Sequence, residues 1–376
     1  MNHRAAPGLV RDSIVTYLTS AESASIAEIC EAVAARIGDV PASSVRSYLN
    51  IKTPELFERT ARGQYRLRKG NRASVNFDLT PKHTIGRAKL HHASCFDWMR
   101  ASDPHSVHAI VTDPPYGLLE YTETEQAKLR KGRGGVWRIP PSFDGHQRSP
   151  LPRFTVLNDG DRTAMRDFFF EFGQLALRVT VPGANIIIAS NPLLVHVVAS
   201  AMAAAGLEVR GQIARLVMTM RGGDRPKNAH EEFPHVSVMP RSMFEPWLVL
   251  RHPLDGRVQD TLRKWGTGGF RRPAAHRPFG DVIPSNPTPK GEKLIAPHPS
   301  LKPQAFLRAI VGAVLPLGKG VILDPFAGSG STLAAANAVG HDSIGIEQDA
   351  RYVAMAQKAI PKLATLVIKQ MDPIRT

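Results

Sequence analysis

Two short stretches of this sequence combine the residue types that chemistry needs. The first begins Ala109-Ile-Val-Thr, a β-branched apolar run that predicts a buried strand. Asp113-Pro114-Pro115-Tyr116 follows, and the prolines end the strand because neither has an N–H to donate to a sheet. A carboxylate, two unpaired carbonyls and an aromatic ring are therefore expected at the carboxyl end of a strand, where open α/β sheets bind ligands. A tight turn with a core tyrosine is the plainer alternative.

The second stretch is Val321-Ile-Leu-Asp-Pro-Phe-Ala-Gly-Ser-Gly-Ser-Thr-Leu, which predicts a strand, a glycine-rich turn and a helix. A dinucleotide site is the rival interpretation, but Leu333 occupies the place of the third glycine of that fingerprint. Asp324 ends the predicted strand, where it can take a cationic amino group. A further predicted strand, Asp342 to Glu347, ends in an acid that can accept hydrogen bonds from ribose hydroxyls.

Asp-Pro-Pro-Tyr resembles the catalytic tetrapeptide of the amino-methyltransferases, which methylate the exocyclic nitrogen of adenine or cytosine in DNA. Asp-Pro-Phe-x-Gly-Ser-Gly resembles the S-adenosylmethionine site of the same enzymes. The catalytic motif comes first and the cofactor motif last, an order that resembles their permuted β group. The resemblance covers about residues 88–359. It implies that Asp113, Pro114, Pro115 and Tyr116 are catalytic, that the target base is flipped out of the duplex, and that S-adenosylhomocysteine is the product.

The resemblance also implies the residues that hold the cofactor. His298-Pro-Ser-Leu-Lys302-Pro resembles the family segment H-P-x-x-K-P, so Lys302 is expected to partner the methionine carboxylate; a solvent-facing lysine is the alternative. Ser94 and Cys95 stand where the family has Gly-Asp-Cys, so the expected acid beside the adenine is absent. The full expected set is Ser94, Cys95, His298, Lys302, Asp324, Phe326, Gly328, Gly330, Ser331 and Glu347.

The composition of the chain limits the classes of partner that it is expected to bind. A formal charge of +15 and a pI near 10.1 favour a polyanion, and double-stranded DNA is favoured over a membrane because no basic amphipathic helix stands out. An arginine-rich composition without a binding role is the alternative. Only Cys30 and Cys95 occur, and no targeting segment, membrane span or metal-ligand spacing is evident. These features predict a cytoplasmic, nucleoid-associated protein without a metal, and they leave open whether it is a homodimer.

Residues 1–70 predict a small separate domain. Helices are expected over residues 9–19, 25–37 and 43–49, the second with Ser25 and Glu28 in a capping box. Residues 56–68 predict a hairpin that turns at Arg62-Gly63. This arrangement resembles a winged helix-turn-helix domain, whose third helix would present Arg46 and Ser47 to a major groove. A packing or dimerisation appendage is the alternative, and residues 71–87 are interpreted as a linker.

Residues 88–376 alternate predicted strands with predicted helices, which indicates a Rossmann-like, doubly wound and mostly parallel sheet. Strands are expected over residues 184–189, 208–217 and 244–250, and helices over 164–179 and 193–205. Residues 120–156 form a long basic loop, and the target-recognition region is expected at about 221–297, with 251–296 irregular. The predicted DNA contacts in these two segments are Arg130, Lys131, Arg133, Arg263, Lys264, Trp265, Arg271 and Arg272.

These observations predict a site-specific DNA methyltransferase that acts on the N6 of adenine. Cytosine-N4 methylation remains open, because both classes share the site. RNA or protein-amide methylation within the same fold is a further alternative, as is a winged-helix regulator without catalytic activity. Intact Asp113, Tyr116, Asp324 and Glu347 weigh against the regulator.

Overall fold

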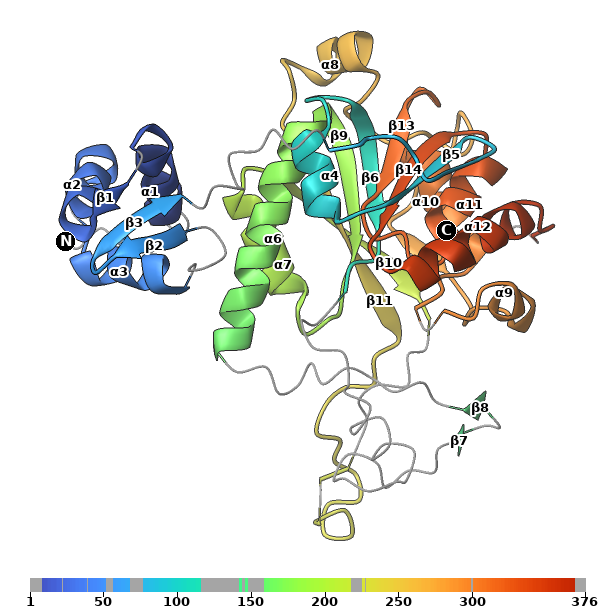
Figure 1. The fold of residues 1–376 in the computed structure, drawn as a ribbon. Coiled ribbons are helices and arrows are strands. Elements are labelled where there is room, and N and C mark those ends of the chain that lie inside the picture. The colour runs from blue at the N-terminus through green and yellow to red at the C-terminus, as the bar shows by residue number, and fades with distance from the viewer. Residues whose placement is uncertain are drawn as a thin grey trace. The chain divides into compact units, whose positions relative to one another are not determined.

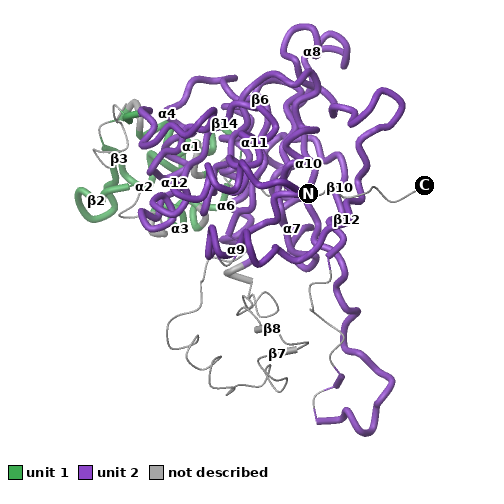
Figure 2. Tube along the Cα trace, turned by 90° about the vertical axis from the view of Figure 1, so that its right-hand side faces the viewer, with its two compact units in different colours: residues 1–78 green, residues 79–376 purple. Residues whose placement is uncertain are grey.

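The computed structural model divides into two compact units, Met1–Asp78 and Leu79–Thr376 (Figure 2). It describes residues 9–21, 23–38, 40–51, 57–67, 77–115, 142–143, 146–147, 159–217, 225–226, 228–298 and 300–368. The division falls inside the predicted linker, 71–87. That linker is shorter than expected, because His83–Ile85 forms a strand, β4, of the larger unit's sheet.

The N-terminal unit contains three helices and a three-stranded antiparallel sheet in the order β1-β3-β2. Its core is apolar and draws on every helix and strand, from Ile14 and Ile29 to Phe57. The predicted helices and hairpin are confirmed, whereas the two-residue strand β1 was too short to predict. The elements are α1 (Leu9–Ser20), β1 (Ala24–Ser25), α2 (Ile26–Ile37), α3 (Ala42–Ile51), β2 (Phe57–Ala61) and β3 (Gln64–Leu67).

The predicted capping box at the start of α2 is present. The Glu28 N–H donates to Ser25 Oγ at 3.3 Å, and the Ser25 N–H donates to Glu28 Oε2 at 2.7 Å. These two bonds satisfy N–H groups that a helix start leaves without partners. The backbone and side chain of Ser25 together hold the pKa of Glu28 below its ordinary value.

The C-terminal unit is built on a nine-stranded sheet in the order β12-β10-β11-β9-β6-β13-β14-β5-β4. Its five central strands, from β9 to β5, are parallel to one another, and β11 and β4 are antiparallel to the strands beside them. The predicted mostly parallel sheet is therefore confirmed. The strands are β4 (His83–Ile85), β5 (Ala88–His92), β6 (Val107–Thr112), β9 (Thr180–Ala189), β10 (Glu208–Leu216), β11 (Phe244–Arg251), β12 (Val282–Pro284), β13 (Val321–Asp324) and β14 (Asp342–Glu347); β7 (Ser142–Phe143) and β8 (His146–Gln147) form a separate hairpin.

Helices cover both faces of this sheet (Figure 1). On one face α6 packs against α4 and α7, and on the other α11 packs against α10 and α12. The core between the sheet and α10 includes Trp247 and Phe306, whose ring centroids lie 5.1 Å apart. The helices are α4 (Cys95–Ala101), α6 (Asp159–Val179), α7 (Val195–Ala204), α8 (Val258–Trp265), α9 (Lys290–Ile295), α10 (Gln304–Val314), α11 (Ser331–Ala338) and α12 (Ala350–Ala364).

The sheet has a topological switch point between β6 and β13. These neighbours are parallel, but the chain leaves β13 for β14 on one side and leaves β6 for β9 on the other. Open α/β sheets bind ligands at the carboxyl ends of such a pair. Those ends carry Asp113 and Asp324, the acids of the two motifs.

Two predictions about local structure were wrong. Residues 251–296 are not irregular, because they contain α8, β12 and α9. Helix α8 is short and polar on average, and Gly266 ends it at a φ of 72°. Strand β9 begins at Thr180, four residues before the predicted start at 184. Its first residues include Pro182 and Gly183, and the pairing with β6 skips from Thr180 to Asn185 there.

Candidate active site

Asp113 follows directly after β6, in contact with a lysine from a distant part of the chain. Lys302 Nζ donates to Asp113 Oδ2 at 2.5 Å. Lys302 was expected to partner the cofactor carboxylate, but its ammonium lies against Asp113, because residues 300–303 lead into α10 beside the carboxyl end of β6. Pro114 is buried and Pro115 is exposed, whereas the predicted catalytic Tyr116 lies outside the described residues.

The lysine belongs to a group of four charged side chains that the sequence analysis recognised only in part. Glu245 Oε1 lies 3.4 Å from Lys302 Nζ, and Arg215 Nη1 donates to Glu245 Oε2 at 2.8 Å. Trp247 Nε1 donates to the same oxygen at 3.2 Å. The sequence held a signal for only one of the two missed residues: Glu245 is a charge near the start of the mostly apolar strand β11, whereas Arg215 lies in β10, which contains several other polar side chains.

Burial gives this group its electrostatic character. The exposed fractions of the side chains are 16% for Asp113, 10% for Lys302, 18% for Glu245 and 7% for Arg215. Burial favours the neutral amine of Lys302, but Asp113 and Glu245 outweigh it and raise the pKa of Lys302. Burial likewise raises the pKa of Glu245, but Lys302 and Arg215 bring it below its ordinary value. Lys302 and Glu245 are thus held in their charged forms, and the four side chains alternate in sign along three successive ion pairs.

The glycine-rich turn begins at the neighbouring strand, β13. Asp324 Oδ1 accepts hydrogen bonds from Thr112 Oγ1 at 2.7 Å and from the Phe326 N–H at 3.2 Å, so the two motifs are joined directly. Burial raises the pKa of Asp324 to about 6, although the Thr112 and Thr332 hydroxyls oppose the shift.

Two glycines in this turn have conformations and surroundings that exclude a side chain. Gly328 has a φ of 50°, and a Cβ there would lie 3.2 Å from His298 Nε2. Gly330 has a φ of 78°, and its Cβ would lie 2.6 Å from Ile360 Cγ1. The backbone of the turn is therefore bare, as a closely approaching ligand requires.

Glu347, the acid at the end of β14, lies beside the glycine-rich turn and bonds to its backbone. Glu347 Oε2 accepts from the Gly328 N–H and Glu347 Oε1 from the Asp349 N–H, both at 2.8 Å. Each carboxylate oxygen keeps further acceptor capacity for a ligand hydroxyl. His298 lies beside Gly328 and packs edge-on against the Tyr352 ring at 4.5 Å.

The remaining predicted cofactor residues lie around this turn. The Phe326 ring packs 5.7 Å from that of Phe172, and the Ser331 carbonyl accepts from Gln304 Nε2 at the start of α11. Ser94 and Cys95 start α4, next to Ala93, whose N–H donates to the Glu347 carbonyl at 3.0 Å. Burial raises the pKa of the Cys95 thiol to about 12, so it is neutral.

Most of the predicted DNA-contacting residues of the larger unit lie far from Asp113. The Trp265 ring lies 5.7 Å from the His105 ring, and His105 is bonded through Nδ1 to the Thr180 carbonyl at the amino end of β9. The Arg271 guanidinium contacts Gly318, just before the start of β13. At about 3.3 Å per residue, the six residues of β6 separate these groups from Asp113 by about 20 Å. Arg263, Lys264, Trp265, Arg271 and Arg272 therefore lie far from the catalytic carboxylate, and their contact with DNA stays a prediction.

The other predicted DNA contacts are only partly described. Arg46 is exposed on α3. The Ser47 side chain, Arg130, Lys131 and Arg133 lie outside the described residues, as does nearly all of the predicted loop 120–156.

A different segment projects from the carboxyl end of the sheet. Strands β10 and β11 pair as far as Leu216 and Phe244, and the connection between them extends away from the sheet in both views (Figures 1 and 2). We call its described residues 228–243 the arm. It exposes apolar side chains, with Val238 at 64%; the others are Phe233, Val236, Met239 and Met243.

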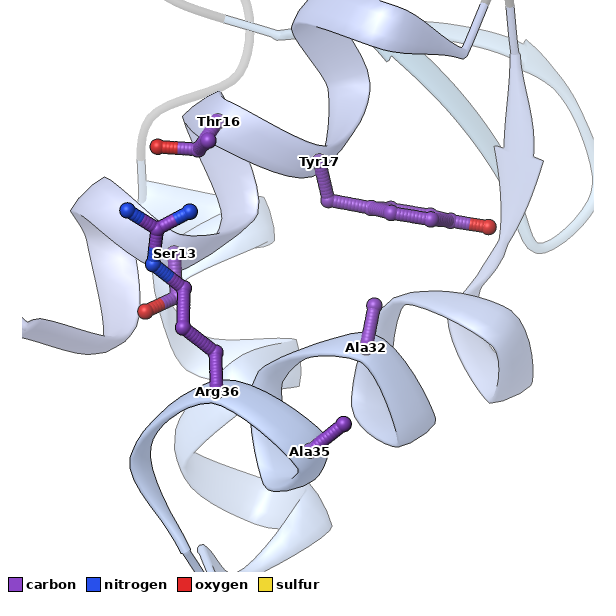
Figure 3. Close-up of a pocket in the computed structure, with 6 residues that line it drawn as sticks. All are labelled: Ser13, Thr16, Tyr17, Ala32, Ala35 and Arg36. Carbon is purple, nitrogen blue, oxygen red and sulfur yellow. The ribbon is translucent and has the colours of Figure 1, made fainter.

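One concavity lies in the N-terminal unit, between α1 and α2, with a volume of about 330 Å³ (Figure 3). Its only charged lining side chain is Arg36, and the rest are Ser13, Thr16, Tyr17, Ala32 and Ala35. Small and neutral groups dominate this lining, so it offers no acid–base pair or nucleophile. The constellation of reactive groups is in the larger unit.

In the described part of the chain, no group of three or more His, Cys, Asp or Glu residues could hold a metal ion. None of the helices there is both long and apolar enough to cross a membrane.

Comparisons with known proteins agree with this site. A family model described as DNA methylase matches residues 107–358. The type II methyltransferase M2.LlaDCHI of Lactococcus lactis subsp. cremoris is 24% identical over 285 residues, which are 76% of this chain and 93% of the relative. M2.DpnII of Streptococcus pneumoniae is also 24% identical, over 74% of this chain and 92% of the relative.

Among solved structures, a complex of M1.HpyAVI with S-adenosylmethionine has a TM-score of 0.45 and 17% identity, and the match covers 74% of this chain and all of that one. The family match identifies the cofactor as S-adenosylmethionine. The chain belongs to the DNA methylase family and is an S-adenosylmethionine-dependent DNA amino-methyltransferase, of the class that modifies adenine N6 or cytosine N4.

Proposed function

We propose that this enzyme methylates the N6 of adenine in double-stranded DNA, with the target base flipped out of the duplex, in the cytoplasm and at the nucleoid. The Asp-Pro-Pro-Tyr motif favours adenine over cytosine. One observation carries the methylation of an exocyclic amine: Asp113 follows β6 at the switch point, and Thr112 joins it to Asp324 of the glycine turn. Asp113, the acid assigned to the target amine, and Asp324, the acid assigned to the cofactor, are thereby placed at the ends of adjacent strands. Methyl transfer between two bound molecules requires this proximity.

The residues support a mechanism without a covalent intermediate. An exocyclic amine is a poor nucleophile because its lone pair is delocalised into the ring. The Asp113 carboxylate and the Pro114 carbonyl accept its two hydrogens, which favours a tetrahedral nitrogen with a free lone pair. The amine nitrogen would take the methyl group from the sulfonium, with the neutral thioether of S-adenosylhomocysteine as the leaving group, and the amine proton that is lost would pass to the Asp113 carboxylate. Tyr116 is assigned to stack on the flipped base, which recovers about 1–3 kcal/mol.

The turn after β13 fits the cofactor. S-adenosylmethionine supplies an electrophilic methyl group on a sulfonium. Asp324 would take its ammonium group, Glu347 its ribose hydroxyls, and the bare backbone at Gly328 and Gly330 allows close approach. Phe326, Ser331, His298 and the Ser94-Cys95 turn complete the proposed lining.

The motif order supports assignment to the permuted β group. Strand β6 with the catalytic acid precedes β13 with the cofactor acid by more than 200 residues, yet the two strands are adjacent in the sheet. The arm lies within the predicted target-recognition region, 221–297, and projects from the same end of the sheet, so we assign it the central part of that recognition role. Its exposed apolar side chains are suited to contact with unstacked bases.

We further propose that the N-terminal unit is a winged-helix DNA-binding domain. Its order α1-β1-α2-α3-β2-β3 and the exposed Arg46, Arg59 and Arg62 support this role. A chain beginning at Leu79 should keep its cofactor affinity but bind DNA with a shallower salt dependence, by about 0.9 in slope per lost phosphate contact. An unchanged slope would instead favour a packing or dimerisation role.

Single-molecule sequencing of DNA from cells that express the chain tests the proposed function, because it reports the base and its sequence context together. We expect N6-methyladenine in one short motif. N4-methylcytosine would assign the enzyme to the other class, and unmodified DNA would favour a regulator without catalytic activity.

A further inference from the structure

We propose that Glu245 is a positioning residue: with Arg215 it holds Lys302 against Asp113 and thereby fixes the catalytic carboxylate for the target amine. The inference rests on the proposed function in one respect, namely that Asp113 meets the amine. It adds two residues, from β10 and β11, to a site that the two motifs place on β6 and β13.

The contacts form an unbroken chain. Arg215 and Glu245 are directly opposite each other in the antiparallel pairing of β10 with β11, one residue before the last pair at the root of the arm. Arg215 is itself fixed by Ser285 Oγ, which accepts from its Nε at 3.0 Å, and by the Asn286 carbonyl, which accepts from Nη2 at 3.1 Å. Glu245 then reaches Lys302 at 3.4 Å, and Lys302 reaches Asp113 at 2.5 Å.

The charges of these four side chains explain why each one depends on its neighbour for its position. Lysine has a flexible four-carbon stem, so its ammonium has no fixed position of its own. The carboxylates of Asp113 and Glu245 hold the Lys302 ammonium from both sides. Its hydrogen bond to Asp113 Oδ2 in turn sets the plane of the Asp113 carboxylate. Without the Glu245 charge, Lys302 would keep one acidic partner and lose the contact that draws it toward β11.

A purely stabilising role explains this arrangement less well. Buried ion pairs contribute little net stability compared with well-packed apolar side chains of similar volume. The hairpin provides a comparison, because Glu208 and Arg251 are also directly opposite each other on β10 and β11 and are paired at 2.6 Å. That pair lies at the other end of the same two strands, away from Asp113, and its Glu208 is 37% exposed against 18% for Glu245, so it serves as a control for removing a glutamate charge from this hairpin.

The test compares Glu245→Gln with Glu208→Gln in the full-length chain. Glutamine keeps the size of the side chain but removes the charge that attracts Lys302. We measure single-turnover methyl transfer at saturating DNA and S-adenosylmethionine, and cofactor affinity by calorimetry. We expect Glu245→Gln to lower the rate by about 10–100-fold with cofactor affinity within twofold, and Glu208→Gln to change neither.

Two lysine variants separate positioning from cofactor binding. Lys302→Arg should retain more of the single-turnover rate than Lys302→Met, and both should bind S-adenosylmethionine within about twofold of the wild-type affinity. If Lys302→Met loses cofactor affinity in proportion to its rate, Lys302 holds the methionine carboxylate and the proposal is wrong. A wild-type rate for Glu245→Gln also overturns it.

Two further measurements keep the proposal falsifiable. If Glu245→Gln does not fold, the doubly apolar variant Arg215→Met/Glu245→Met removes both charges together and should fold but remain slow; a wild-type rate in that variant contradicts the proposal. A crystal structure of Glu245→Gln is independent of activity: we expect a reoriented Asp113 carboxylate, and an unchanged Lys302–Asp113 contact would overturn the proposal. Failure of the wild-type chain to methylate DNA would count only against the proposed function.

Discussion

The two ends of the parallel strands use the same residue types for different purposes. At the carboxyl end, Asp113, Lys302, Glu245 and Arg215 are all less than one-fifth exposed and are paired across four separate segments. At the amino end, Lys264 pairs with Asp255 of its own segment, and the two side chains are 63% and 42% exposed.

The difference shows that burial, and not the number of charges, marks the chemical site. An exposed pair is screened by water and salt and stabilises little. A charge at the buried end has few alternative partners, so its removal leaves another charge uncompensated. The predictions below test this contrast from the strongest expected effect to the weakest.

Removing the catalytic carboxylate should have the largest effect. We expect Asp113→Ala to reduce single-turnover methyl transfer to background, because the amine loses its acceptor, while calorimetry shows cofactor binding largely intact. The matched control is Asp97→Ala on α4, since Asp97 is an exposed acid paired only with its neighbour Arg100 among the contacts described. Wild-type turnover by Asp113→Ala would remove Asp113 from the mechanism.

Replacing Asp324 by asparagine should raise the free energy of unfolding above about pH 4 and at the same time weaken cofactor binding. Its folded-state pKa of about 6 is above the ordinary 3.8, so the folded chain holds a proton that the unfolded chain has lost between about pH 4 and 6. Stability therefore falls as the pH rises through that window and stays lower above it. Asp324→Asn should be more stable than the wild type at pH 8, by up to about 3 kcal/mol, with the difference disappearing below about pH 4.

Urea unfolding at a series of pH values measures this difference. The same variant should bind S-adenosylmethionine much more weakly at neutral pH, because the ammonium group loses its carboxylate. Lower stability of Asp324→Asn at pH 8 would contradict the burial argument.

Glu347→Ala should weaken S-adenosylmethionine binding by about 1–3 kcal/mol, the usual effect of leaving buried polar partners unsatisfied. The turn also loses the acceptor for the Gly328 N–H. Calorimetry measures the cofactor affinity, and DNA affinity without cofactor serves as the control and should barely change. Unchanged cofactor affinity would exclude Glu347 as the ribose acceptor.

The smallest effect is expected at the amino end. The double variant Arg263→Ala/Lys264→Ala removes two exposed cations of α8, whose described partners are Asp260 and Asp255. The single-turnover rate should stay within about twofold of the wild type. A loss comparable to that of Glu245→Gln would show that this end of the sheet also contributes to the chemistry.

Features that depend on residues close together in the sequence could be predicted, whereas features that depend on distant segments could not. Asp113 and Asp324 each follow a short apolar run, so their place at strand ends could be inferred from a few neighbours. The pairing of Arg215 with Glu245 could not, because it depends on the register of a hairpin whose connection has no regular pattern. The place of Lys264 at the amino end could not be predicted for a different reason: a basic, glycine-rich segment does not reveal at which end of a sheet it lies.

The measurement that tests the central claim most directly is nucleoside analysis after reaction of the purified chain with unmethylated DNA and S-adenosylmethionine that carries a deuterated methyl group. Mass spectrometry of the digested DNA should show trideuterated N6-methyladenine formed over several turnovers, and none with Asp113→Ala. Label on cytosine C5, on RNA or on protein instead of an exocyclic amine of DNA would contradict the account, as would equal labelling by Asp113→Ala.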